Sequence, residues 1–277
     1  AIGFQAGYSS QGGDSVAIGR NTGQTSQGDT AIAVGYQAGM TTQALGAIAI
    51  GKLAGKSQQG LKALGVGYYA GNTDQGAQAA ALGFYAGRLQ QGAYATAVGT
   101  NSAEFSQANY SIAVGAEAGR YTQSAYAVAM GYQAGTGSAT AGDVQGAYAV
   151  AIGYQAGKTL QGLSGVAIGR GTGQISQGDY AVAIGHTSGV TSQGNQSVAI
   201  GILAGYTSQG GSSVAIGTST GKTSKPAKRG PRNFISPKRT PKRRAFFVPK
   251  NPRKRSYCVP VAYQTAVRRL VRCNRRA

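Results

Sequence analysis

The chain has few acidic residues and few of the residue types that build enzyme sites or disulfide frameworks. Its 277 residues include 7 Asp and Glu, 1 His, 2 Cys and no Trp. Two cysteines exclude a disulfide framework and the paired cysteine spacings of zinc sites. The few acids are scattered, so no two carboxylates are aligned for general acid–base catalysis. The sequence therefore predicts a protein that is not an enzyme, with no catalytic residue, cofactor or metal ion.

Long apolar segments are also missing. No uninterrupted apolar run approaches the roughly 18 residues of a membrane-spanning helix, and the first residues do not form a signal peptide. We therefore expect no membrane insertion. The sequence starts at Ala1 within a repeated pattern, which indicates a processed product or a fragment of a longer chain. Glycine does not recur at every third position, which excludes collagen.

Proline and positive charge are absent or scarce in one part of the chain and abundant in the other. Residues 1–224 contain no proline, 9 of the 27 Lys and Arg, and all 7 acids, for a net charge of +2. Residues 225–277 contain all 7 prolines, 18 Lys and Arg, and no acid. This division predicts a nearly neutral repeat domain over 1–224 and a basic, proline-rich arm over 225–277.

A repeat of 16 residues organises the first region. An apolar–Ala–apolar–Gly signature ends at an anchor glycine in each repeat, and a step of 22 residues between Gly131 and Gly153 predicts a six-residue insertion near 136–141. Such a period predicts a stacked repeat fold. The 14 anchor glycines are Gly3, Gly19, Gly35, Gly51, Gly67, Gly83, Gly99, Gly115, Gly131, Gly153, Gly169, Gly185, Gly201 and Gly217.

Each repeat is too short for two helices and a turn. Short β-branched runs bounded by glycine are typical of strands, and two strands of about five residues with two tight turns fit the length. The sequence therefore predicts an all-β parallel β-solenoid of 14 coils. At a coil spacing of about 4.7–4.8 Å, the rod would be roughly 65 Å long.

Two rows of side chains and a few single residues carry further predictions. Glutamine recurs eight residues after the anchor, from Gln11 to Gln209, which predicts a ladder of side-chain amides along the stack. A row of tyrosines that includes Tyr94 and Tyr110 predicts ring stacking between coils, with a ligand-binding stripe as the alternative. His186 is expected on the surface. Among the acids, only Asp29 and Asp179 occupy equivalent positions.

The strand that precedes each anchor is apolar on both faces. In Ser15–Gly19, Val16 and Ile18 point to one face and Ala17 to the other, because strand side chains alternate. Strands that are apolar on both faces are usually covered on both. We therefore expect one face to line the interior of the coil and the other to meet another sheet or subunit. The alternative is a wider single-chain coil that uses both faces internally.

The repeat resembles the head repeats of trimeric autotransporter adhesins of the YadA-like type. The S-V-A-I-G segments Ser15–Gly19, Ser197–Gly201 and Ser213–Gly217 carry the resemblance, which covers about residues 1–221. It implies a left-handed β-roll, a homotrimer, and an extracellular role in binding or display. The present repeat is longer than that of the adhesins, and no heptad stalk or membrane strands follow it. Similar repeats also occur in structural and fibre proteins of phages and large DNA viruses.

The arm is expected to be extended, because proline at this density is incompatible with a helix or a central strand. Two S/T-P-K-R units within 236–243 resemble the S-P-K-K motif of histone tails, which lies in the DNA minor groove. Phe234, Phe246 and Phe247 favour docking on protein instead. The partner of the arm is thus capsid protein or nucleic acid, with a nuclear-localisation signal as a third interpretation. The candidate binding cations are Lys228, Arg229, Arg232, Lys238, Arg239, Lys242, Arg243, Arg244, Lys250, Arg253, Lys254 and Arg255.

The end of the arm has a different pattern. Apolar residues that include Val267, Leu270 and Val271 stand among three arginines in 261–273, which predicts a short amphipathic helix. Cys258 precedes this segment and Cys273 is its last residue. They are expected to be free thiols, or a disulfide if the protein reaches an oxidising environment.

Together these features favour a structural protein of a virion. In this hypothesis the chain is a minor capsid protein, or a spike-type or fibre-type component, of a large DNA virus. It contacts copies of itself and capsid proteins. The alternative is a cell-surface or extracellular adhesin head that binds host matrix or glycans.

Overall fold

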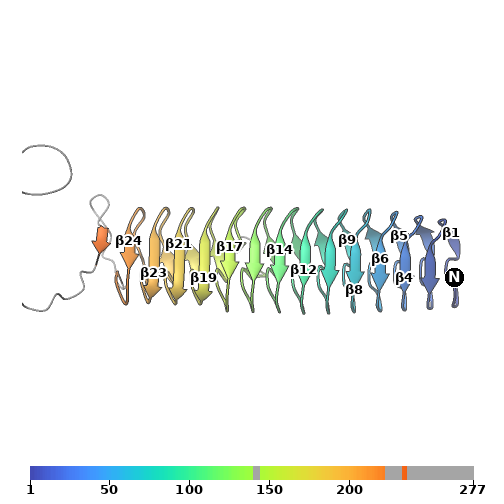
Figure 1. The fold of residues 1–277 in the computed structure, drawn as a ribbon, viewed down its shortest axis with the longest axis horizontal. Helices are drawn as coiled ribbons and strands as arrows, with labels where there is room; N and C mark the ends of the chain where they lie inside the picture. The colour runs from blue at the N-terminus through green and yellow to red at the C-terminus, as the bar shows by residue number, and fades with distance from the viewer. Residues whose placement is uncertain (140–143, 222–232, 236–277) are drawn as a thin grey trace, which may run out of the picture. The chain divides into compact units, whose positions relative to one another are not determined.

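The computed structural model describes residues 1–139, 144–221 and 233–235. Among these residues there is no helix, and the strands stack in parallel as a β-solenoid (Figure 1), which confirms the predicted fold class. The chain divides into two units, Ala1–Ser236 and Pro237–Ala277, and all described residues belong to the first.

One long sheet of 14 strands runs along one side of the solenoid. The first coil adds an isolated bridge from Ile2 to Ile18, so thirteen of the fourteen predicted coils have a regular strand here. The fourteenth strand, β25, follows the last coil and pairs with β24. In order, the strands are β2 (Val16–Ile18), β4 (Ile32–Val34), β6 (Ile48–Ile50), β8 (Leu64–Val66), β10 (Ala80–Leu82), β12 (Thr96–Val98), β14 (Ile112–Val114), β16 (Val128–Met130), β17 (Val150–Ile152), β19 (Val166–Arg170), β21 (Val182–His186), β23 (Val198–Ile202), β24 (Val214–Ile216) and β25 (Asn233–Ile235).

Two shorter sheets form the second side of the solenoid. The sheet of eight strands contains β1 (Ser9–Gln11), β3 (Thr25–Gln27), β5 (Thr41–Gln43), β7 (Ser57–Gln59), β9 (Thr73–Gln75), β11 (Leu89–Gln91), β13 (Ser106–Gln107) and β15 (Thr122–Gln123). The sheet of three strands contains β18 (Thr159–Gln161), β20 (Ile175–Gln177) and β22 (Thr191–Gln193). Gln145 joins the two through isolated bridges to Gln123 and Gln161.

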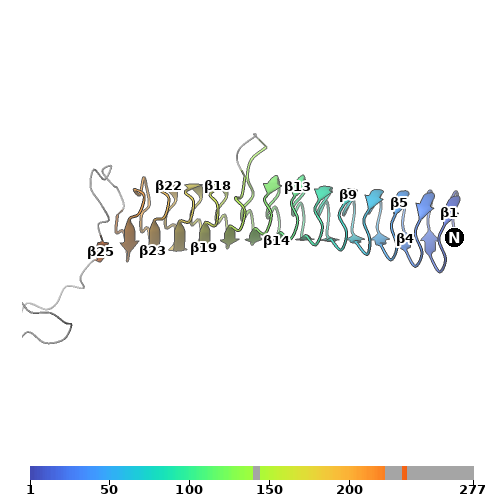
Figure 2. The same cartoon turned by 90° about the horizontal axis from the view of Figure 1, so that it is seen from above.

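The register follows the sequence repeat. Ala81 pairs with Ala97, 16 residues on, whereas Ala129 pairs with Ala151 across the longer step. The extra residues lie between Gly135 and Gln145, and the described residues on either side of 140–143 leave the solenoid on one side (Figure 2). The insertion therefore lies where the repeat predicted it, and the stack continues unbroken beneath it.

Most strands are shorter than the predicted five residues. Only β19, β21 and β23 reach that length, and most of the others have three residues. The physical reason is the number of residues with positive φ at the corners. In β3, Ser26 has a φ of 54°, and Gly19 ends β2 with a φ of 132°. Left-handed residues turn the chain, so straight segments between them stay short.

Alanine fills the interior of the solenoid. Ala81 and Ala97 in neighbouring strands have no exposed surface, while the flanking Leu82 is 47% exposed. Small side chains allow the two sides of a narrow coil to approach closely. The larger aliphatic residues therefore point outward, and the alternative of a wide coil with both faces inside is wrong.

The glutamine row forms the predicted amide ladder inside the coil. Gln75 Nε2 donates to Gln91 Oε1 at 3.0 Å and to the Leu64 carbonyl at 2.7 Å. Each such amide ties its coil to the next and also closes the coil across its width. The ladder runs from Gln27 to Gln123 and again from Gln145 to Gln193.

Two glycines per coil leave room for this arrangement. Gly83 has a φ of 133°, and a Cβ there would lie 2.7 Å from the Gly99 carbonyl oxygen of the next coil. Gly87 has a φ of 51°, and its Cβ would lie 2.8 Å from Gln91 Oε1. The first glycine thus permits close stacking, and the second makes room for the buried glutamine.

Candidate functional site

The outward face of the long sheet is a continuous apolar surface. Each strand from β2 to β24 presents two outward positions, one on each side of its buried central residue. Nearly all of these positions hold Val, Ile, Leu or Met, and none is buried in any described coil. Ile18 is 40% exposed and Ile216 is 45% exposed, so the surface extends over the described length of the rod. The name outer face is used for these two rows.

A stack of tyrosine rings borders the outer face on one side. The ring centroids of Tyr94, Tyr110, Tyr126 and Tyr148 are separated by 4.9, 5.1 and 5.0 Å, and the rings are parallel within 3°. The predicted stacking between coils is confirmed. The rings are about half exposed, so they widen the apolar surface.

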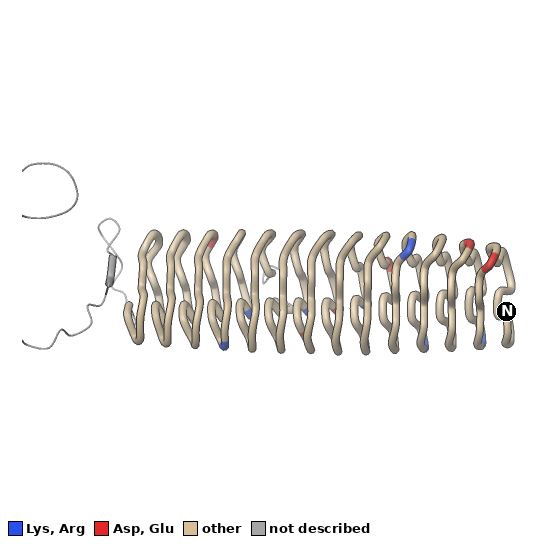
Figure 3. Tube along the Cα trace, in the orientation of Figure 1, with Lys and Arg blue, Asp and Glu red and all other residues tan. Residues whose placement is uncertain are grey.

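The position after each anchor glycine borders the outer face on the other side. Lys52 Nζ lies 5.9 Å from the ring centroid of Tyr36 and 5.5 Å from that of Tyr68, a cation–π arrangement. His186 occupies the same row and is exposed, as predicted. Its Nε2 lies 3.5 Å from Arg170 Nη1. Charges are few along the described rod (Figure 3), and none lies in the two rows of the outer face.

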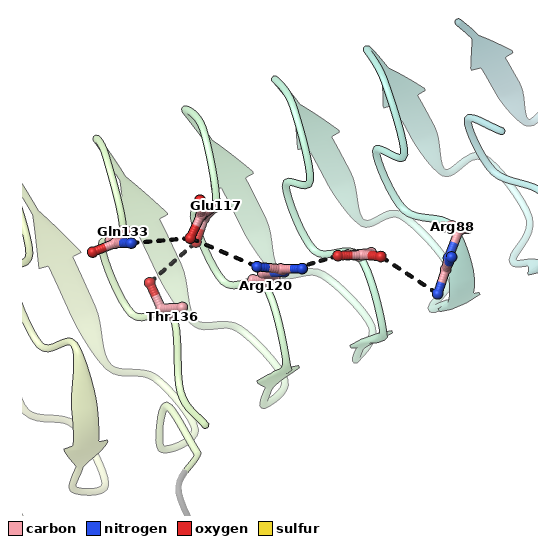
Figure 4. A network of polar contacts seen from close by, with 6 residues as sticks. Arg88, Glu117, Arg120, Gln133 and Thr136 are labelled. Carbon is pink, nitrogen blue, oxygen red and sulfur yellow. Dashed lines mark hydrogen bonds and ion pairs between the residues drawn. The ribbon is translucent and has the colours of Figure 1, made fainter. Parts of the chain in front are cut away.

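An ion-pair network crosses the coils on another side of the solenoid (Figure 4). Glu104 is 4% exposed and receives a hydrogen bond from Arg120 Nε at 2.8 Å. Its other carboxylate oxygen lies 3.4 Å from Arg88 Nη2. Arg120 also approaches Glu117 at 3.8 Å, and Gln133 donates to Glu117 at 3.0 Å. The buried carboxylate is thus held between cations from the coil before and the coil after.

The network raises the pKa of one arginine. Burial lowers the pKa of Arg120, but the hydrogen bond from its guanidinium to Glu104, together with the negative charge of Glu104, outweighs the burial and raises the pKa above its ordinary value. This network was not predicted from the sequence. The signal was available, because Arg88, Glu104 and Arg120 are spaced by 16 residues and therefore occupy the same position in successive coils.

The two acids at equivalent positions have a structural role. The backbone N–H of Gly13 donates to Asp29 Oδ1 at 2.8 Å, and that of Leu163 donates to Asp179 Oδ1 at 2.9 Å. In both cases the donor belongs to the preceding coil, 16 residues earlier. These carboxylates therefore link successive turns of backbone.

The predicted binding residues of the arm fall outside the described residues, with one exception. Phe234 lies in β25, where its backbone pairs with Ala215. Phe246, Phe247, the candidate helix over 261–273, Cys258 and Cys273 are outside the described ranges. The twelve candidate cations, from Lys228 to Arg255, are outside them as well.

Residues 1–139, 144–221 and 233–235 contain no group of three His, Cys, Asp or Glu side chains placed to hold a metal ion. They also contain no helix long and apolar enough to cross a membrane. No family model, curated protein or solved structure matches the chain.

Proposed function

We propose that the chain is a non-enzymatic structural protein of a virus particle, in which a β-solenoid rod associates with copies of itself through the outer face. The observation that carries the proposal is the outer face, an apolar surface that no other part of the described chain covers. Monomeric soluble proteins rarely expose a contiguous apolar patch of more than a few hundred Å². Thirteen stacked strands at about 4.8 Å make a surface roughly 60 Å long, which favours a partner along its whole length.

A second copy of the same chain is the partner that best matches the outer face. The surface repeats once per coil, so an identical rod offers the same period and the same apolar character. A closed ring of identical chains covers the face of every member and leaves no open edge to propagate. The resemblance to trimeric adhesin heads favours three chains in that ring.

The basic arm supports a location inside a particle. Residues 225–277 carry 18 positive charges without an acid, whereas residues 1–224 carry a net charge of +2. A segment of this kind binds acidic protein surfaces or phosphates, and the latter mode depends strongly on salt. We propose that the rod is the rigid part of the molecule and the arm attaches it to capsid proteins, with nucleic acid as the alternative partner.

Deletion of residues 225–277 tests this proposal. The truncated chain should still form the solenoid but should no longer enter particles, as measured by quantitative mass spectrometry of purified virions. A full-length variant with the arm cations replaced by glutamine separates charge from aromatic docking by Phe234, Phe246 and Phe247. If the truncated chain enters particles at the normal copy number, the proposed role of the arm is wrong.

A cell-surface adhesin head is the second candidate function. A groove beside Phe105 and Tyr121 favours it, because that groove interrupts an otherwise regular repeat. Under this alternative, truncation of the arm leaves binding to a host surface intact.

A further inference from the structure

One row of side chains changes character in the middle of the rod. The position six residues after the anchor holds Ser or Thr in the first five coils, from Ser9 to Thr73. In the next three coils it holds Leu89, Phe105 and Tyr121. The rings of Phe105 and Tyr121 are parallel within 1°, with centroids 5.3 Å apart. We call these three residues the apolar ridge.

The backbone departs from the repeat at the same place. The following position has positive φ from Ser10 to Gln90, and again from Leu160 to Ser208. Ser106, Thr122 and Ser138 are the described exceptions to this pattern. The six-residue insertion begins one coil later, after Gly135. Side chains, backbone and chain length therefore all change within a few neighbouring coils.

These changes border an open groove of about 600 Å³. The apolar ridge forms one wall. A second row, which we call the polar ridge, runs beside it through Asp74, Gln90, Ser106 and Thr122. Thr73, Ser138 and Ala139 complete the lining. The groove thus presents apolar and hydrogen-bonding groups in two parallel rows, which is typical of a ligand site.

The ion-pair network holds the apolar ridge in place from the side. The guanidinium carbon of Arg88 lies 5.3 Å from the Phe105 ring centroid, and that of Arg120 lies 5.3 Å from the Tyr121 centroid. Both arginines are fixed in turn by the buried Glu104. A ligand would therefore meet rings that are already ordered, which lowers the entropic cost of binding.

We propose that this groove binds an uncharged linear oligosaccharide, with successive sugar rings along successive coils. Sugars contact proteins through apolar C–H groups against aromatic rings and through hydroxyl groups against carboxylates, amides and hydroxyls. The apolar ridge supplies the first kind of contact, and Asp74 and Gln90, both exposed, supply the second. The coil spacing of about 4.8 Å is close to the length of one pyranose unit in an extended chain.

Two other ligand classes fit less well. Side chains on one face of an extended peptide recur about every 6.6–6.8 Å, which does not match the coil spacing. Anionic glycans would meet the carboxylate of Asp74, while the nearby Arg88 and Arg120 are already paired with Glu104.

Titration of the full chain with cellohexaose and chitohexaose, monitored by saturation-transfer NMR and calorimetry, tests the proposal. At least one of the two hexasaccharides should bind, and Tyr121→Ala and Asp74→Ala should each weaken binding by tenfold or more. Ile175→Ala is the matched control, because it removes an exposed apolar side chain at the equivalent position of a later coil, outside the groove, and should leave binding unchanged. Ser106→Tyr fills the groove without removing a packed side chain, so it keeps the test valid if Tyr121→Ala unfolds the rod.

The proposal is overturned if neither hexasaccharide binds at millimolar concentration, if binding persists in Asp74→Ala and Ser106→Tyr, or if a sulfated hexasaccharide or an extended peptide binds in preference. These outcomes concern the isolated chain. They are therefore distinct from particle incorporation, on which the proposed structural function depends.

Discussion

At the scale of single residues, the buried glutamine amide is the group that most defines this solenoid. Gln59 Nε2 donates to Gln75 Oε1 at 3.0 Å and to the Ile48 carbonyl at 2.7 Å, and its side chain is almost wholly buried. A buried polar group is tolerable only when its hydrogen bonds are satisfied. The narrow interior therefore combines small apolar residues with one buried amide per coil, and within each unbroken run of the ladder the amide donates to the next one.

Gln59→Ala should lower the free energy of unfolding by about 2–4 kcal/mol, because it leaves a cavity and unpaired buried groups on both sides of the missing amide. Urea denaturation followed by circular dichroism measures the change. The neighbouring Gln58 is exposed, so Gln58→Ala should stay within about 0.5 kcal/mol of the parent chain. Equal effects of the two substitutions would contradict the ladder.

The anchor glycines make a second prediction at this scale. Gly83→Ala should destabilise the rod by about 2–5 kcal/mol, because the new Cβ collides with the next coil and the positive φ disfavours alanine. Gly13→Ala is the control, since the nearest atom to its Cβ would be 3.8 Å away and its φ is ordinary. Thermal melting of both variants should show a loss of stability for Gly83→Ala alone.

At the scale of the coil, ion pairs between side chains in the described residues are confined to one network. Glu104 lies between Arg88 and Arg120, and the three residues occupy one position in successive coils. Removing one partner of a buried ion pair costs more than the pair contributes, because the remaining charges lose their compensation. Since the arginines are about one quarter exposed, water reduces that cost.

Glu104→Gln should therefore destabilise the rod by about 1–3 kcal/mol. It should also loosen the rings of Phe105 and Tyr121, a change visible in the near-ultraviolet circular dichroism. Asp14→Asn removes the same charge from an exposed position and should change neither signal. An unchanged spectrum for Glu104→Gln would argue against the network as the support of the apolar ridge.

The repeat predicted the features that recur in nearly every coil, but not the features confined to a few coils. The spacing of the anchor glycines predicted the coil, the register, the insertion and the glutamine ladder, because each depends on features present in nearly every repeat. The strand length was wrong, because positive φ at Ser26 and its equivalents is not evident from residue type. The groove and the Arg88–Glu104–Arg120 network were not predicted, because both consist of residues that depart from the consensus of the repeat.

At the scale of the whole molecule, each coil contacts its neighbours along the stack, so stability depends on interfaces between successive coils. In the described rod the glutamine ladder is buried, whereas the aliphatic side chains of the outer face are exposed. That arrangement is consistent with a surface that is covered on assembly. The association of rods through the outer face is the central claim, because the proposed structural role depends on it.

The most direct test is the mass of the full chain in solution, measured by sedimentation equilibrium at micromolar concentration. We predict that the full chain sediments with the mass of three chains. Ile50→Lys and Ile168→Lys place charges on the outer face and should make this trimer dissociate. Gln58→Lys and Ser192→Lys add the same charges to exposed positions on the shorter sheets and should leave the trimer intact. A parent chain that sediments as a single copy, or an assembly that survives the outer-face substitutions, would contradict the account.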